Sequence, residues 1–172
     1  MAILTLSGRA ALAAALKARP LHLAWGAGDP AWDDLSINDY PPSTADTALV
    51  NEIGRRALTL SQFVIEDEDG AITVNDVDDP TIKKKFSPSP EGAATNHLYL
   101  LFNFDFEDAP AATIREIGIF ADTATHPDLP PGQKYFTPGE IVSPGILVAL
   151  ERLPFFNRQP SVRQTFEQVI TI

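Results

Sequence analysis

The sequence predicts a mainly β protein of the α+β class: an antiparallel β-sandwich with two short helices near the N-terminus. The main evidence lies in two neighbouring runs that alternate apolar and polar positions, as half-buried strands do. The second run, 114–120, places Ile117 and Ile119 on one side. A short connection of Asp, Ala and Pro joins the runs, so we expect a strand pair. The first run places five large side chains on one face: Leu98, Leu100, Phe102, Phe104 and Phe106.

The first predicted helix covers residues 7–19. This segment is rich in Ala, which has the highest helix propensity, and Ser7 can cap its start. Leu12 and Leu16 share a face at the i, i+4 spacing, and Pro20 ends the helix. A short Ala-rich helix is marginal alone in water, so we expect it to dock on this chain or on a neighbour.

The second predicted helix covers residues 44–60. Leu49, Val50, Ile53 and Ala57 form an apolar stripe at helical spacing. The end of the first predicted helix sets the expected domain boundary. We expect an N-terminal helical extension, 1–20, and then a β-sandwich-like domain, 21–172.

The remaining strands are separated by many turn residues, among them 15 Pro and ten Gly. Asp69 followed by Gly70 favours a hairpin turn, and 75–92 is predicted as a loop around a short extended piece. A helical interpretation of the later run 145–153 stays open, and Pro154 is expected to end that run. Further strands are predicted at 21–25, 63–65, 71–74, 145–153 and 162–172.

Composition excludes several functions. A net charge of −10 argues against nucleic acid as a partner, because phosphate recognition needs Lys and Arg, and it also disfavours anionic membranes. The chain has no Cys, which excludes disulfides, thiolate metal sites and Cys nucleophiles. No apolar run approaches the roughly 20 residues that span a bilayer. We therefore expect no nucleic-acid partner and no membrane partner.

A survey of motifs predicts no catalytic residues, no cofactor and no metal site. His22, His97 and His126 lie far apart, and no phosphate-binding or nucleophile motif is present. The acidic residues between 66 and 79 leave open a choice between an ion site and a solvated turn. The brief basic run 83–85 is predicted to pair with Asp78 and Asp79, either within the chain or across a subunit interface.

Four phrases occur in a familiar order: LHLAWGAGDPAWD at 21–33, ALVNEIGRRALTLSQFVIEDEDG at 48–70, NHLYLLFNFDFEDA at 96–109 and TIREIGIFADT at 113–123. Together they resemble bacteriophage tail proteins of the kind related to tail-collar and tail-fibre N-terminal domains and to baseplate attachment (adaptor) proteins. The resemblance implies a structural, non-enzymatic component of the virion tail, assembled in the host cytoplasm. Its implied partners are other phage tail or baseplate proteins, within a symmetric homo-oligomer.

We expect contacts along the helix at 7–19, the loop at 26–43 and the Pro-rich segment at 127–144. Arg55 and Arg56 are expected to pair with Glu52 or Glu116. The candidate interface and scaffold residues are Leu12, Leu16, Trp25, Asp29, Trp32, Arg55, Arg56, Arg115 and Glu116.

Two alternatives stay open. A carbohydrate-binding module or small glycan-degrading enzyme would use the aromatic and acidic residues at 25–40, around Trp25, Trp32 and Tyr40. A head or decoration protein would be a structural protein at another place in the virion.

Overall fold

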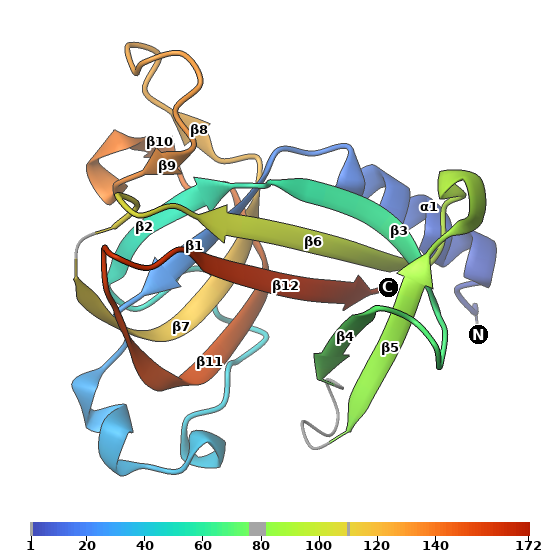
Figure 1. Ribbon diagram of the computed structural model, residues 1–172, viewed down its shortest axis with the longest axis horizontal. Helices are drawn as coiled ribbons and strands as arrows, with labels where there is room; N and C mark the ends of the chain where they lie inside the picture. The colour runs from blue at the N-terminus through green and yellow to red at the C-terminus, as the bar shows by residue number, and fades with distance from the viewer. Residues whose placement is uncertain (1, 76–81, 110) are drawn as a thin grey trace. The chain divides into compact units, whose positions relative to one another are not determined.

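The computed structural model of the protein describes residues 2–75, 82–109 and 111–172. The fold is mainly β with antiparallel sheets, as predicted (Figure 1). The one α-helix in these described residues is α1, Leu6–Lys17. The strands are β1 Leu21–Gly26, β2 Glu52–Ala57, β3 Leu60–Glu66, β4 Ile72–Asn75, β5 Lys83–Pro88, β6 His97–Phe104, β7 Ala112–Ala121, β8 Ala124–Thr125, β9 Tyr135–Phe136, β10 Ile141–Ser143, β11 Ile146–Arg158 and β12 Gln164–Thr171, with short 3-10 helices η1 Pro30–Asp34, η2 Ile37–Asp39, η3 Pro90–Gly92 and η4 Pro138–Glu140.

The chain divides into two compact units. The first unit comprises Met1–Arg19, Thr59–Phe102 and Phe166–Ile172, and the second comprises Pro20–Leu58 and Asn103–Thr165. β6 and β12 each contribute residues to both units. The expected division into 1–20 and 21–172 stays a prediction, and the predicted sandwich packing is not confirmed.

The first unit is built on a sheet of strand order β12-β6-β3-β5-β4. Its core contains Val64, Phe86 and Tyr99. The predicted hairpin of 63–65 with 71–74 is wrong, because β5 lies between β3 and β4 and pairs with both. Gly70 explains the geometry: a Cβ there would lie 2.4 Å from the backbone of Phe86, so only glycine lets β5 pass so close. The extended piece expected within 75–92 is the full strand β5.

Helix α1 begins one residue earlier than predicted. Thr5, and not Ser7, caps it, since the Gly8 amide donates to the Thr5 hydroxyl at 3.1 Å. Ala13 is fully buried, and the Lys17 ammonium lies 5.5 Å from the centre of the Phe63 ring. The helix therefore docks on its own unit through the small side chain of Ala13 and the ammonium group of Lys17.

The second predicted helix, 44–60, is wrong. Residues 52–57 form β2, which pairs with β1 and β9. Asn51 has φ of 55°, a left-handed conformation that ends any helix, and a Cβ on Gly54 would lie 2.1 Å from the Tyr135 hydroxyl. Leu49, Val50 and Ile53 have helical spacing in the sequence, but pairing with neighbouring strands determines the structure here.

The second unit is built on a sheet of strand order β11-β7-β1-β2-β9, beside the small sheet β10-β8. All of β1 and the last eight residues of β7 are buried, so this sheet is covered on both faces. The predicted strand pair is wrong: β6 pairs with β3 and β12, and β7 pairs with β1 and β11, so both edges of each strand are taken.

The predicted alternation of buried side chains in the run 98–106 is largely confirmed. Leu98, Leu100, Phe102 and Phe104 are buried, whereas Phe106 lies beyond the end of β6 and is 44% exposed. β11 continues past the expected stop at residue 154, with an irregular register between Arg152 and Phe156. A bulge thus accommodates the proline in an edge strand.

Candidate functional site

The residues of the phage-tail resemblance meet in the second unit, on the two faces of one sheet. The register places Trp25 beside Gly54 and Ile117 on one face, and Ala24 beside Arg55 and Gly118 on the other. Trp25 is fully buried and stacks on Phe104, with ring centroids 3.6 Å apart. Trp25 is therefore a core residue.

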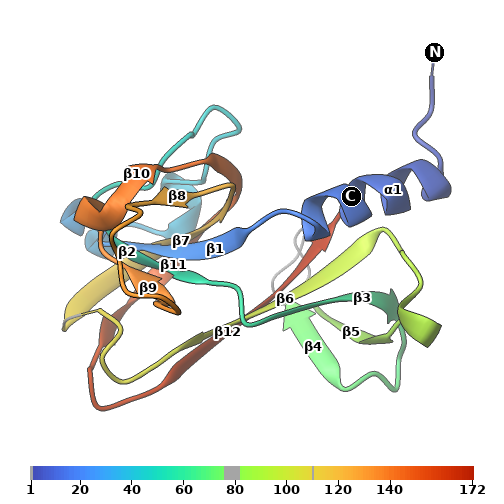
Figure 2. The same cartoon turned by 90° about the horizontal axis from the view of Figure 1, so that it is seen from above.

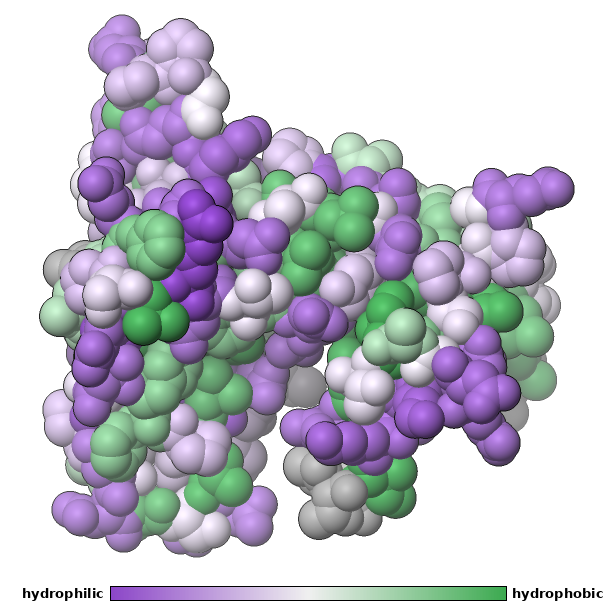
Figure 3. Space-filling model, in the orientation of Figure 1, coloured by the Kyte–Doolittle hydropathy of each residue, from purple (hydrophilic) through white to green (hydrophobic). Residues whose placement is uncertain are grey.

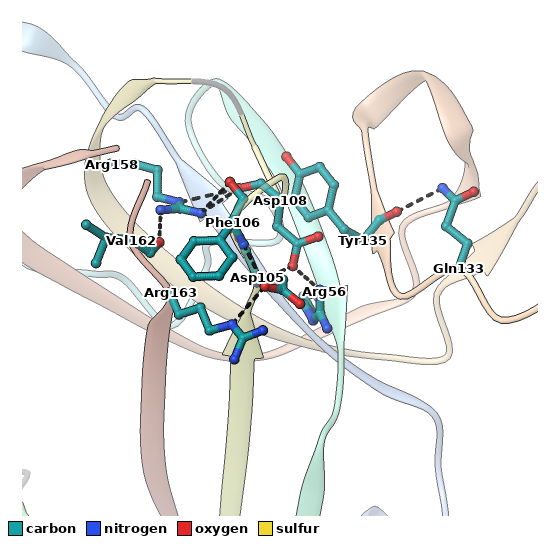
Figure 4. Close-up of polar contacts among 9 residues, drawn as sticks. All are labelled: Arg56, Asp105, Phe106, Asp108, Gln133, Tyr135, Arg158, Val162 and Arg163. Carbon is teal, nitrogen blue, oxygen red and sulfur yellow. Dashed lines mark hydrogen bonds and ion pairs between the residues drawn. The ribbon is translucent and has the colours of Figure 1, made fainter. Parts of the chain in front are cut away.

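Arg158 holds two turns together next to this stack. Its guanidinium is 1% exposed and donates to the carbonyl oxygens of Asp105 at 2.6 Å and Asp108 at 3.2 Å (Figure 4). It also donates to the carbonyls of Gln159 and Val162. Desolvation by burial lowers the pKa of Arg158, and these carbonyls offset part of that cost. The result is a fixed link between 105–108 and 159–162.

A polar hollow lies beside this link. Arg56 forms an ion pair with Asp108, whose carboxylate also accepts from the Asp105 amide at 2.7 Å. Arg163 donates to Asp105 at 2.9 Å and lies 4.8 Å from the Phe106 ring. Arg56 therefore does not pair with Glu116 as expected. The lining comprises Arg56, Asp105, Phe106, Glu107, Asp108, Gln133, Lys134, Tyr135 and Arg163.

The charges of the hollow balance each other. Its three cations face three carboxylates, and two of each are joined in ion pairs. Burial raises the pKa of Tyr135 to about 12, so its phenol stays protonated and donates to the Ile53 carbonyl at 3.3 Å. Such a surface attracts neither anions nor cations strongly, and its contacts serve to order the loop 105–109.

The other face of the sheet holds Arg55. Its guanidinium donates to both carboxylate oxygens of Glu52, at 2.8 and 2.6 Å, so the expected pairing of Arg55 with Glu52 is confirmed. It also donates at 2.7 Å to Thr123 and to the Pro144 carbonyl, and it lies 4.0 Å from the Phe120 ring. With 1% exposure, Arg55 has an internal structural role.

Arg115 and Glu116 anchor the long loop 27–51. Arg115 donates to both oxygens of Asp33 at 2.7 Å, and to the Ala27 carbonyl at 2.8 Å. The hydrogen bonds from Arg115 lower the pKa of Asp33. Glu116 is fully buried and accepts from the Val50 amide, while burial raises its pKa. Both residues lie within β7, and their side chains contact the loop.

Arg152 completes this anchoring from β11. It donates to the carbonyls of Tyr40 at 2.7 Å and Pro41 at 2.8 Å, and it lies 3.3 Å from Asp46. Its guanidinium is 4.7 Å from the centre of the Trp32 ring. Three charged side chains of the sheet thus hold both ends and the middle of the loop.

Trp32 is part of the same anchor. Its ring stacks on Tyr40 with centroids 5.0 Å apart. Gly28 has φ of 64°, and a Cβ there would lie 2.5 Å from the Trp32 ring. Asp29 caps η1 by accepting from the Ala31 amide at 2.9 Å. The phrase GAGDPAW therefore encodes a close loop-to-sheet packing, and its aromatic rings are used internally.

The acidic turn after β3 shows local contacts. Asp67 accepts from Ser87 at 2.5 Å and from the Asp69 amide at 3.0 Å, and Lys84 lies 3.9 Å from Glu66. Asp78 and Asp79, the expected partners of 83–85, lie outside the described residues. Within 2–75, 82–109 and 111–172, no group of three or more His, Asp or Glu is placed to hold a metal ion. In that same part of the chain, no helix has the length and apolar character to cross a membrane.

A comparison with protein families decides the class of protein. The model of a family described as baseplate wedge 3 tail fiber network component matches residues 1–172. The chain belongs to this family. The resemblance to bacteriophage tail proteins is thus confirmed, and the protein is a structural component of the baseplate and tail fibre network. A search of curated proteins gave no match.

In this baseplate protein, the anchors that sequence reasoning missed are Arg152, Arg158, Asp33 and Asp108. Most of their partners lie 50 or more positions away in the chain, and those of Arg158 are backbone carbonyls. Such contacts leave no pattern in the sequence. Leu12 is 50% exposed and Leu16 is half-buried, and both lie on α1 in the first unit.

Proposed function

We propose that this protein is a non-enzymatic adaptor that joins parts of the baseplate and tail fibre network through protein–protein contacts. It acts in the virion tail as a symmetric homo-oligomer bound to other tail proteins, and it is assembled in the host cytoplasm. Trp25, Asp29, Arg55, Arg56, Arg115 and Glu116 form the internal scaffold of this adaptor.

The observation that carries the proposal is the way loop 27–51 is held. Arg115, Glu116 and Arg152 fix the loop from the sheet side, which leaves Leu35 48% and Val50 39% exposed. A loop with an ordered backbone and exposed apolar residues loses little entropy when it meets a partner. This is the property that an assembly protein needs.

The Pro-rich segment 127–144 is a second contact candidate of different character. Polar residues gather over the projecting loop between β8 and β9 in the space-filling view (Figure 3). A polar loop suits a hydrated rim contact, whereas the apolar residues of 27–51 suit the centre of an interface.

The test is electron microscopy of phage particles made without this protein. We expect tails whose baseplate lacks its attached fibres, and wild-type protein supplied from a plasmid should restore them. Leu35→Gln should restore them less well than Leu60→Gln, which changes a comparably exposed Leu on β3, outside the proposed contact segments. Intact tails with defective heads would contradict the proposal, and so would glycan binding by the purified chain that Trp32→Ala abolishes.

A further inference from the structure

The first twelve residues carry an unusual amount of exposed apolar surface. Ile3 is 81% exposed, Leu4 48%, Leu6 74% and Leu12 50%. The segment before α1 extends away from the strands of its unit (Figure 2). Apolar side chains gathered so closely on a surface are typical of a protein interaction site.

The packing of α1 leaves this surface unused. One face of the helix carries Leu6, Ala10, Ala13 and Lys17. On this face Ala13 is fully buried, whereas Leu6 is 74% exposed. The helix thus docks on its own unit through Ala13 and the ammonium group of Lys17. Its leucines at positions 6 and 12 point to solvent.

Charge indicates the partner. Residues 2–19 contain Arg9, Lys17 and Arg19 and no acidic residue, so the rest of the chain has ten basic residues against 23 acidic ones. Loop 27–51 is the opposite: it has no Lys or Arg. Its acidic residues are Asp29, Asp33, Asp34, Asp39 and Asp46. Arg115 pairs with Asp33 and Arg152 with Asp46, so the negative charge left to a partner comes from Asp29, Asp34 and Asp39.

The acidic loop also offers apolar contacts. Leu35 and Val50 are exposed there, although Arg115 and Arg152 hold the loop backbone. A basic, leucine-bearing helix and an acidic loop with exposed aliphatic residues are complementary in both charge and polarity. Both surfaces remain exposed within one chain, so each is free to meet a second copy.

We propose that residues 2–19 of one copy dock on loop 27–51 of a second copy. The two surfaces differ, so the contact is head-to-tail, and repetition closes a ring when the rotation between copies allows it. This inference rests on the proposed assembly function and names the surface through which copies join.

Sedimentation velocity of the full chain over a range of concentrations tests the inference. We expect reversible association, and Leu6→Gln or Leu12→Gln should each raise the dissociation constant by about tenfold, because Gln keeps the helix but removes a buried Leu. Leu35→Gln should act in the same direction, and Leu60→Gln, which changes an exposed Leu on β3, should leave association unchanged. A chain that stays monomeric at all concentrations would overturn the inference, as would association that none of the three Leu variants weakens.

A charge exchange tests the pairing of the two surfaces. Arg9→Glu and Asp34→Arg should each weaken association, and the double variant should recover part of the loss. Additive losses in the double variant would overturn the pairing. These results are separate from the particle experiment, because a monomeric protein that is still needed for fibre attachment would leave the proposed function standing.

Discussion

The two units of this protein are stabilised in different ways. In the second unit, the buried polar and charged side chains are His22, Arg55, Asp108, Arg115, Glu116 and Arg158, whereas the described residues of the first unit bury Ser89. The first unit packs Val64, Phe86 and Tyr99 with partly buried aliphatic residues. Burial of charge is costly, so its concentration in one unit needs a reason.

The reason lies in the connections that each unit must order. The second unit contains loop 27–51 and the turns at 105–109 and 159–162, whose backbone groups have few partners in a sheet. Arginine supplies several donors from one planar group, so Arg115, Arg152 and Arg158 satisfy loop carbonyls and carboxylates together. In the described residues of the first unit no connection is as long as loop 27–51, and the core there is apolar.

The largest expected effect comes from Arg158→Ala. Removal of this buried guanidinium takes away the donor that the carbonyls of Asp105, Asp108 and Val162 share, and we expect a loss of about 3–5 kcal/mol in the free energy of unfolding. Urea denaturation measures it. Arg163→Ala is the matched control, because that side chain is 68% exposed and should cost below about 1 kcal/mol. Equal losses for both variants would show that the buried Arg158 stabilises the second unit no more than an exposed arginine does.

The next effect depends on pH. His22 is buried, and desolvation and the nearby Arg55 lower its pKa from 6.5 to about 4. The unfolded chain then binds more protons than the folded one, so stability is fully present above pH 6.5 and falls as pH drops toward 4, by roughly 3 kcal/mol. Denaturation midpoints at several pH values measure this loss. His22→Phe should remove it and the exposed His126→Gln should not; an unchanged profile in His22→Phe would show that other groups control the pH response.

A smaller effect is expected in the first unit from Gly70→Ala. The added Cβ would lie 2.4 Å from the backbone of Phe86, so β5 has to shift, at a cost of about 1–3 kcal/mol. Gly139→Ala is the control, because a Cβ there has no neighbour within 4 Å among the described residues. Thermal or urea unfolding compares the two variants. Equal stability would mean that β5 does not depend on this close approach.

The smallest effect is expected from Lys84→Ala. The Lys84–Glu66 contact is 3.9 Å long and both side chains are about half exposed, so the loss should stay below about 0.5 kcal/mol. The same denaturation experiment measures it. A loss above 1 kcal/mol would show that ion pairs stabilise the first unit as well.

Local patterns in the sequence predicted part of this structure. The helix at 7–19 and the alternation in β6 depend on spacing within one element, and the Arg55–Glu52 pair joins residues three positions apart. β2 was missed because its stability comes from β1 and β9, and its residues also fit a helical stripe.

Contacts between residues far apart in the sequence also explain why the arrangement of the candidate site was not predicted. Arg115 and Glu116 were identified as important, but their partners Asp33 and Val50 lie 82 and 66 positions away. The direction of a buried side chain toward a distant loop depends on the whole sheet register. The resemblance to phage tail proteins found these positions without explaining their contacts.

The central claim is that the buried arginines of the second unit act inward to hold loops, and that the loops and α1 meet other proteins. A cryo-electron microscopy map of the assembled baseplate tests this claim most directly. We expect Arg55, Arg115, Arg152 and Arg158 to keep their partners within the chain, while loop 27–51 and α1 contact neighbouring chains. Arginines that turn outward to bind carboxylates of another chain, with loop 27–51 left in solvent, would contradict it.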